Sequence, residues 1–274
     1  FQLIKMNTRG KEIAVQAKGL SIGYNDSKGS KVVQKDVDLT LYSGEVTCLL
    51  GLNGAGKSTL LNCISSELKY EALSFKFKEK QIKQYTKKEL PLHRAKFSQQ
   101  QASEINLKIN EIVLMGRYPY FSNEPDDEDW QLVNLWMQKT ETNHLQDREY
   151  EQLSGGEKQR LHLARVFAQL ENNIDQKLIL LDEPLNNLDV AHQYKTLHLI
   201  KAFTKNNNAA LVVLHDLNIA AQFADRLLLL NKGKIEIVDT PEKVLTKERI
   251  TKVYQYPCTL SNHPVTQQPI ILFG

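Results

Sequence analysis

The sequence predicts an α/β fold in which a mostly parallel sheet carries helices on both faces. From about residue 157 onward, apolar runs of strand length alternate with segments of helical spacing. A glycine-rich turn at 51–59 (GLNGAGKST) joins one apolar run to a helical segment, and a second apolar run at 177–184 (KLILLDEP) contains two adjacent carboxylates. Parallel strands need helical crossovers of this kind, because a tight turn cannot return the chain to the same end of the sheet.

The glycine-rich turn lies between a predicted strand and a predicted helix. The preceding run, 44–51 (GEVTCLLG), is apolar and bounded by glycines, as expected of a short buried strand. The following run, 57–68 (KSTLLNCISSEL), places apolar side chains on one side of a helix. Glycines let backbone amides point inward, and a helix N-terminus adds partial positive charge, so the turn can hold a polyphosphate.

The turn fits the pattern G-x-x-x-x-G-K-[ST], which is typical of phosphate-binding loops. We therefore predict a nucleoside triphosphate site, with Lys57 on the β- and γ-phosphates and Ser58 as a ligand of Mg²⁺. A flexible glycine turn would explain the glycines but not the ordered strand, loop and helix. The predicted binding residues are Gly51, Asn53, Gly54, Ala55, Gly56, Lys57, Ser58 and Thr59.

Composition narrows the classes of protein that fit. The 274 residues can bury one large α/β core, or such a core with a small insert. A net charge of +3 gives no field that would favour nucleic acid, and the densest basic stretch, 76–88, predicts a solvated strand and turn, with contact to anionic lipid as the alternative. Cys48, Cys63 and Cys258 have no metal-site spacing and indicate a reduced, cytosolic compartment. The apolar runs fall short of the ~20 residues of a membrane span, so any membrane role must come through a partner.

The carboxylates of the run 177–184 suit a nucleotide-hydrolysing site. Asp182 is placed to hold Mg²⁺, and Glu183 to polarise an attacking water. We expect Asp182 to lie on a strand next to that of the phosphate loop. Two solvent-facing acids at a strand end are the alternative.

A second anion site is predicted at 153–160 (LSGGEKQR), where a serine and two glycines precede a helical run. One bound nucleotide does not need two such sites within one chain. We therefore expect Ser154 and Gly156 to close over the γ-phosphate held by a second copy, in a head-to-tail two-fold dimer.

Together these motifs resemble the ATP-binding subunit of ABC transporters, and the resemblance covers nearly the whole chain. It implies a P-loop NTPase (RecA-like) core with a parallel sheet, an antiparallel β subdomain and an inserted helical subdomain. The predicted boundaries are one nucleotide-binding domain over 13–274, a helical insert at about 100–155 and an N-terminal extension at 1–12. Within the insert, an acidic start at 126–129 and apolar residues three or four apart after it predict a helix.

The resemblance also assigns roles to the motifs. Residues 51–59 become the Walker A loop, and 178–183 the Walker B strand with Glu183 as catalytic base. Residues 153–157 become the signature, and 187–189 the D-loop that crosses the dimer. Leu185 and Asn186 replace the more usual Thr and Ser, and we expect neither to take part in the chemistry. The implied nucleotide contacts outside the Walker A loop are Ser154, Gly155, Gly156 and Asp189.

Three further site residues follow from the resemblance. Tyr24 is expected to stack on adenine, although a packed strand aromatic is the alternative. His215 is expected to contact the γ-phosphate, with a purely structural histidine as the alternative. Gln99 best matches the Q-loop residue that senses the γ-phosphate and ligates Mg²⁺ beside Ser58 and Asp182, and Gln100 remains possible.

The cargo is suggested by segments outside the nucleotide site. The stretch 111–121 (EIVLMGRYPYF) resembles the segment after the Q-loop in importers of iron chelates, haem and cobalamin, and this part of the chain is implied to dock onto a permease. A lengthened link before the Walker B strand and the tail 254–274 resemble haem (hemin) importers more than ferric-siderophore importers. Siderophore or cobalamin import remains the alternative.

The implied protein is an ATPase that uses ATP and Mg²⁺. Its implied partners are a second copy, an integral-membrane permease dimer and, indirectly, a periplasmic or lipoprotein substrate-binding protein, with no nucleic acid. Its implied place is the cytoplasmic face of the bacterial inner membrane, as a peripheral subunit.

Soluble relatives of such ATPases are the competing class. A ribosome-acting protein would carry two cassettes, and a chromosome-structuring ATPase would carry a long heptad insertion; the sequence has neither. An assembly scaffold of the iron–sulfur type is distinguished mainly by the stretch GRYPYF, which predicts docking to a permease.

Overall fold

The computed structural model describes residues 11–26, 29–98, 107–146 and 148–274. At its centre is a sheet with the strand order β11-β10-β3-β9-β8-β7. Neighbouring strands run parallel except β11, which pairs antiparallel with β10. The strands are β3 (Val46–Leu50), β7 (Arg94–Phe97), β8 (Leu178–Asp182), β9 (Ala209–Val213), β10 (Arg226–Asn231) and β11 (Lys234–Asp239).

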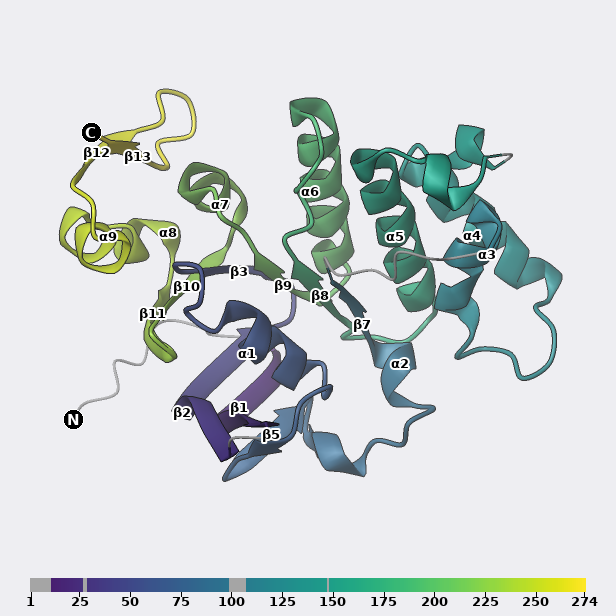
Figure 1. Cartoon of the computed structure of the whole chain (residues 1–274), viewed down its shortest axis with the longest axis horizontal. Helices are drawn as coiled ribbons and strands as arrows, with labels where there is room; N and C mark the ends of the chain where they lie inside the picture. Colours follow the sequence, from purple (N-terminus) through teal and green to yellow (C-terminus); the bar gives the residue numbers. More distant parts are fainter. Residues whose placement is uncertain (1–10, 27–28, 99–106, 147) are drawn as a thin grey trace.

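Both faces of the central sheet are covered, which confirms the predicted architecture. Every residue of β3, β8 and β9 is buried, so these strands read as continuous apolar runs. Figure 1 shows α5 (Gly155–Leu170), α6 (Val190–Lys205) and α7 (Leu217–Phe223) along one side of the sheet. On the other side lie α1 (Lys57–Ile64) and an antiparallel sheet (Figure 1).

The antiparallel sheet has the order β2-β1-β5-β6, with β4 pairing with β1. In β5, buried Phe75 and Phe77 alternate with half-buried neighbours, so one face packs on the core while lysines reach solvent. The basic stretch 76–88 therefore forms the expected solvated strand and turn. The elements here are β1 (Ile13–Asp26), β2 (Gly29–Tyr42), β4 (Tyr70–Glu71), β5 (Ser74–Phe77), β6 (Lys80–Gln81), η1 (Ile82–Gln84) and α2 (Leu90–His93).

The helix after the phosphate loop is shorter than the sequence pattern indicates. The pattern extends to residue 68, but α1 ends at Ile64. Ser66 has a φ of 58°, which breaks the helix. The Arg94 guanidinium donates to the carbonyls of Ile64 and Ser65, each at 2.6 Å, and thus caps the helix end.

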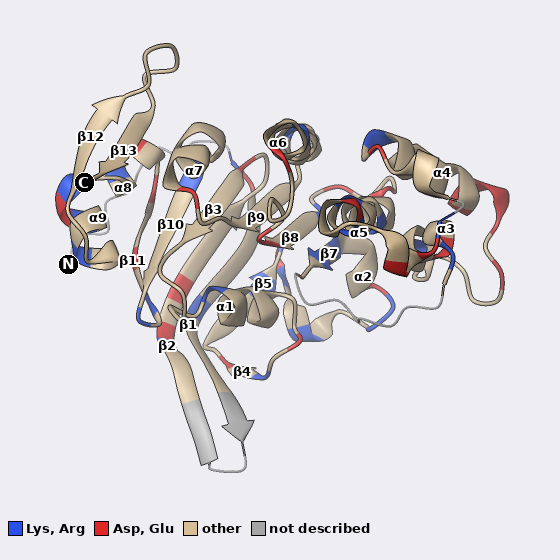
Figure 2. Ribbon diagram, turned by 45° about the horizontal axis from the view of Figure 1, so that its top comes forward, with Lys and Arg blue, Asp and Glu red and all other residues tan. Residues whose placement is uncertain are grey.

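A group of helices lies between β7 and α5 in the chain, within residues 107–152. It packs on α5 and adds to the core on that face of the sheet. The acidic start of α4 lies at the outer edge of the molecule (Figure 2), and Asp126 caps the helix by accepting from the Asp129 amide at 2.9 Å. The elements are α3 (Ile109–Leu114), η2 (Met115–Arg117), α4 (Asp127–Lys139), η3 (Asn143–Leu145) and η4 (Tyr150–Gln152).

The C-terminal segment covers the β10–β11 end of the central sheet (Figure 1). It comprises α8 (Pro241–Val244), α9 (Lys247–Tyr254) and a hairpin of β12 (Cys258–Asn262) and β13 (Pro269–Phe273). Asn218 of α7 holds the hairpin through the Ile271 carbonyl at 3.2 Å and amide at 2.8 Å. The three cysteines are buried and free. Among the described residues, no helix is both long and apolar enough to cross a bilayer.

Candidate functional site

The phosphate loop is shaped by glycines that no other residue could replace without strain. Gly51, Gly54 and Gly56 have φ values of 149°, 77° and 101°. A Cβ on Gly51 would lie 2.2 Å from the Leu230 carbonyl oxygen, and one on Gly56 would lie 2.8 Å from Gln34 Nε2. The N-cap residue of α1 is Gly56, which has no side chain to cap the helix, so the first amides of α1 can bind an anion at its N-terminus.

Lys57 closes this loop from within. Its Nζ donates to the carbonyls of Gly51 at 2.8 Å and Leu52 at 3.1 Å, and the side chain is buried. Burial lowers the pKa of Lys57, and the nearby Glu183 and Asp182 oppose this effect. A buried ammonium that is bonded, within the described structure, to backbone carbonyl oxygens is well placed to exchange them for phosphate oxygens.

Asp182 stands at the end of β8 and meets the start of α1. Contrary to expectation, its strand is not next to that of the phosphate loop, because β9 lies between β3 and β8. The side chain nevertheless comes close enough to Ser58 for that residue to lower the pKa of the Asp182 carboxyl. Burial raises the pKa of Asp182, the nearby Ser58 opposes this, and the buried Oδ1 has no hydrogen-bond partner among the described residues. A buried carboxylate oxygen without a partner, beside a hydroxyl, is a donor set that suits Mg²⁺.

Glu183 is held from several sides. It follows β8 with a φ of 53°, and its Oε1 lies 2.5 Å from Nε2 of His215, which comes just after β9. Asn186 Nδ2 donates to Glu183 Oε2 at 2.6 Å, and Gln159 Nε2 donates to the Glu183 carbonyl at 3.1 Å. The structure thus brings the predicted base, Glu183, together with His215, the histidine predicted to contact the γ-phosphate. These contacts fix the direction of the carboxylate.

The signature residues begin α5. Ser154 is the N-cap and forms a capping box with Glu157. The Ser154 amide donates to Glu157 Oε2 at 2.8 Å, and the Glu157 amide donates to Ser154 Oγ at 3.3 Å. Both glycines face Asn187: a Cβ on Gly155 would lie 3.4 Å from its side chain, and one on Gly156 would lie 2.7 Å from its carbonyl oxygen. These glycines therefore let the D-loop pass close to α5 in the same chain.

The two candidate anion sites lie on opposite faces of the central sheet. Apolar residues of α1 belong to the core under the antiparallel sheet, whereas those of α5 belong to the core on the helical side. Ser154 is exposed at the start of its helix. The phosphate loop and the signature of one chain thus sit on helices that cover different faces.

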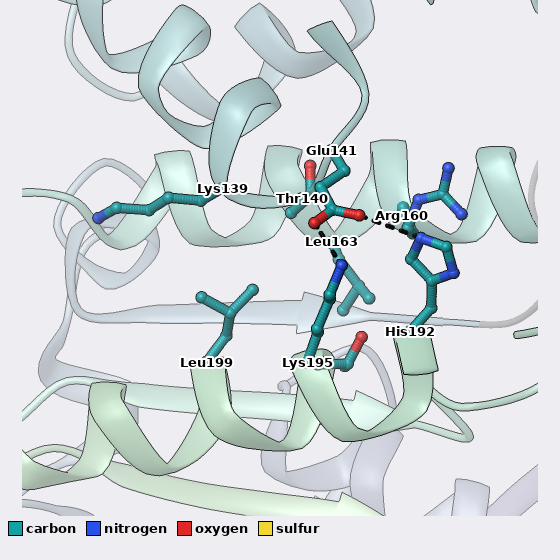
Figure 3. A pocket seen from close by; sticks show the side chains of 9 residues that line it. Lys139, Thr140, Glu141, Arg160, Leu163, His192, Lys195 and Leu199 are labelled. Atoms are coloured by element: carbon teal, nitrogen blue, oxygen red, sulfur yellow. Dashed lines mark hydrogen bonds and ion pairs between the residues drawn. The ribbon is translucent and has the colours of Figure 1, made fainter. Parts of the chain in front are cut away.

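Asp189 ends the D-loop and caps α6, accepting from the His192 amide at 2.9 Å. His192 also joins two carboxylates. Its Nδ1 lies 2.8 Å from Asp189. Its Nε2 lies 3.2 Å from Glu141 (Figure 3). Lys195 contacts the same Glu141 at 2.5 Å (Figure 3). The D-loop helix is therefore tied to the segment that follows α4.

Comparison with known proteins agrees with this site. The ABC transporter family matches residues 34–186, which is more than half of the chain. The chain belongs to the ABC transporter family. It is 41% identical over 260 residues to the hemin import ATP-binding protein HmuV of Vibrio parahaemolyticus, covering 94% of this chain and 96% of that protein. It is 38% identical over 262 residues to HmuV of Vibrio vulnificus strain YJ016, covering 95% and 98%.

A solved structure gives the same answer at the level of the fold. A transporter described as of the metal-chelate type, in an inward-facing conformation, matches with a TM-score of 0.76 and 25% identity over 96% of this chain and 97% of that one. The chain is thus an ATP-binding ABC ATPase, and membership of this family implies a dimer and a membrane-permease partner.

Some predicted residues of the ABC site lie outside the described side chains. Tyr24 belongs to β1, where its backbone pairs with Lys31, but its side chain is not described. Gln99 and Gln100 fall outside the described residues.

Sequence reasoning missed two residues of this ABC site. Asn186 was expected to take no part in the chemistry, yet its amide holds the Glu183 carboxylate. Gln159, on the signature helix, was not considered. Its side chain is buried and bonds the Glu183 carbonyl, and a polar residue on the inner face of α5 was the only signal that could have pointed to it.

Proposed function

We propose that this chain is the ATP-hydrolysing subunit that powers hemin import through a membrane permease, working as a head-to-tail dimer. The observation that carries the hydrolytic part is the Glu183 carboxylate, oriented by His215 and Asn186 beside the phosphate loop. The cargo is supported by the relatives named hemin import ATP-binding protein, which match over nearly the whole chain. Those names belong to the relatives and motivate the same role here.

The chemistry of the chain's own residues follows from their contacts. Amides of the phosphate loop and of the first turn of α1 bind the triphosphate, and Lys57 exchanges the carbonyls of Gly51 and Leu52 for phosphate oxygens. Glu183 accepts a proton from the attacking water, and Asn186 keeps its carboxylate aimed. His215, released from Glu183, contacts the γ-phosphate.

Mg²⁺ fits the pair formed by Ser58 and Asp182. The partnerless buried Oδ1 of Asp182 is an acceptor that a cation would satisfy, and the Ser58 hydroxyl lies beside it. When bound there, Mg²⁺ would neutralise charge on the β- and γ-phosphates. We expect Gln99, or Gln100 in its place, to complete the ligand set.

The dimer explains why the second anion site is built. With α1 and α5 on opposite faces of the sheet, a signature closes most naturally over the phosphate loop of a second copy. We expect Ser154, Gly155 and Gly156 to contact that copy's γ-phosphate, and Asp189 to cross the interface. Tyr24 would stack on the adenine of its own chain.

The partners and the place of action extend this proposal. The nucleotide-binding domain spans 13–274, and its helical insert, about 100–155, faces the permease with the exposed Tyr118 at its surface. The chain then sits as a peripheral subunit on the cytoplasmic face of the inner membrane. A periplasmic or lipoprotein binding protein would deliver cargo to the permease.

The test is purification of the full chain from membranes with whatever it retains, followed by transport in proteoliposomes. Recovery of a polytopic membrane subunit and ATP-dependent uptake of hemin, but not of a ferric siderophore or cobalamin, is expected. A complex carrying Glu183→Gln is the matched control and should not transport. Recovery of soluble partners alone would favour the assembly-scaffold class instead. Uptake of siderophore in preference to hemin would keep the ATPase role and refute the cargo.

A further inference from the structure

The stretch 116–121 (GRYPYF) was expected to serve as docking surface, but much of it is packed against the C-terminal end of the signature helix α5. Gly116 is buried, and a Cβ placed on it would lie 2.2 Å from the Arg165 carbonyl oxygen. The backbone of η2 therefore touches the backbone of α5. A side chain at this position would push the two elements apart.

Arg117 donates hydrogen bonds to the C-terminal end of the same helix. Its Nη1 donates to the carbonyls of Ala168 and Glu171, each at 2.9 Å, and its Nε donates to Asp129 Oδ1 at 2.9 Å. Arg117 is buried, and its guanidinium lies 3.6 Å over the ring of Tyr120. The last carbonyls of a helix lack α-helical partners, and the Ala168 carbonyl accepts from the Glu171 amide at 3.3 Å; Arg117 adds a shorter, charged donor there.

Tyr120, three residues after Arg117, also bonds to the end of α5. Its hydroxyl donates to the Gln169 carbonyl at 2.6 Å and accepts from Asn172 Nδ2 at 2.6 Å. Burial raises the pKa of Tyr120, which keeps this hydroxyl protonated and able to donate. Arg117 and Tyr120 thus donate to the carbonyls of three residues at the end of α5, Ala168, Gln169 and Glu171.

The Arg117–Asp129 pair is better suited to fixing geometry than to adding stability. Both side chains are 5% exposed, and the cost of desolvating a buried ion pair largely offsets its attraction. A guanidinium, however, offers donors in fixed directions within one plane. Because these donors reach α4 and the end of α5 together, Arg117 fixes the geometry between the two helices.

The same segment also has an exposed residue on its outer side, Tyr118. Tyr118 is 54% exposed and stacks edge-to-face on Phe121 at 5.6 Å between ring centroids. Tyr118 therefore lies outward, Phe121 beneath it is partly buried against the core, and residues 116, 117 and 120 contact α5. At its other end α5 begins with the signature serine, Ser154.

We propose that Arg117 is a positioning residue that couples the surface at the exposed Tyr118 to the signature helix. This inference rests on the proposed function, because it assigns a route by which permease contact reaches the ATPase site. Arg117 touches neither the phosphate loop nor Glu183. Its loss should leave nucleotide binding to the chain intact while weakening stimulation of hydrolysis by the permease.

The experiment compares Arg117→Lys with Tyr120→Phe, a milder change that removes only the hydroxyl. Arg249→Lys is the matched control, since Arg249 also donates to two carbonyls at the end of a helix, α8, at 2.7 Å and 2.8 Å, and does not contact α5 in the described structure. For each variant we would measure the affinity for a fluorescent ATP analogue, the ATPase rate of the isolated chain, and the ATPase rate after reconstitution with the copurified membrane subunit. Thermal unfolding of each variant reports loss of structure.

We expect Arg117→Lys to lower permease stimulation at least about fivefold, the lower end of typical coupling between sites. Tyr120→Phe should lower it in the same direction but less. Analogue affinity and the isolated rate should stay within about twofold of wild type, and Arg249→Lys should change nothing.

Three outcomes would overturn the inference, and they are distinguishable. If the permease stimulates wild type and Arg117→Lys equally, Arg117 transmits nothing and the proposed function still stands. If Arg117→Lys lowers the isolated and the stimulated rates by the same factor, its role is structural only. If wild type itself shows no stimulation, the proposed function fails and the inference falls with it.

Discussion

The amide of Asn186 can be removed without touching the base it holds. Asn186→Ala leaves Glu183 with its contact to His215 but takes away the donor that lies 2.6 Å from Oε2. The Glu183 side chain is 18% exposed, so solvent only partly replaces the lost bond. A hydrogen bond to a charged group contributes about 1.5–3 kcal/mol.

If that contribution acts on the aim of the base in the transition state, kcat should fall about ten- to a hundredfold. KM for ATP should change little, because Asn186 does not contact the phosphate loop. Steady-state phosphate release at a series of ATP concentrations separates the two parameters. Asn231→Ala is the control, since Asn231 makes an equivalent bond to Glu236 at 3.0 Å on the exposed β10–β11 turn.

The double variant Asn186→Ala with Glu183→Gln closes the cycle. Once the carboxylate is gone, removal of Asn186 should cost no further activity, since the two side chains act as one unit. An unchanged kcat in Asn186→Ala, or a full additive loss in the double variant, would refute the idea that Asn186 acts by orienting Glu183.

Three further outcomes test the rest of the site and the signature helix. Glu183→Gln should bind ATP normally but accumulate a closed dimer, visible by size-exclusion chromatography with ATP; hydrolysis at the wild-type rate would show that another group is the base. Lys57→Ala should weaken ATP binding itself, measured by titration with a fluorescent analogue, and unchanged affinity would contradict the phosphate-loop assignment. His162 packs in α5 with Nε2 at 2.8 Å from the Tyr150 hydroxyl, and burial lowers its pKa to about 3. The unfolded chain therefore takes up a proton that the folded chain refuses, so the free energy of unfolding should fall by up to about 1.4 kcal/mol per pH unit from about pH 6.5 towards pH 3. His162→Gln should flatten that fall in urea titrations, and an unchanged slope would show that other groups govern acid stability.

Local patterns predicted those parts of the site that lie within one strand–loop–helix unit. The phosphate loop was predictable because its glycines, its lysine and the flanking apolar runs occupy a single stretch around 51–59. The Walker B strand was predictable because a protein with a phosphate loop also needs a metal-binding carboxylate, and a buried strand that ends in two acids supplies one. The order of strands was not, since periodicity does not reveal that β9 inserts between β3 and β8.

Side-chain partners far apart in sequence were beyond reach of such patterns. Asn186 looked like a neutral departure from the family pattern until the fold placed its amide against Glu183. The α1 helix looked longer because Arg94, which caps it, comes from a strand that begins thirty residues later.

By itself, the amino-acid order determined that this chain binds a nucleoside triphosphate on an α/β sheet, because the residues that turn amides toward an anion are adjacent along the chain. Only the tertiary structure decided how that site is supported. Gly156 is required by the Asn187 carbonyl 2.7 Å from its missing Cβ, and Arg117 by the carbonyls at the end of α5. Such requirements arise from close packing between distant segments, and packing exists only once the chain has folded.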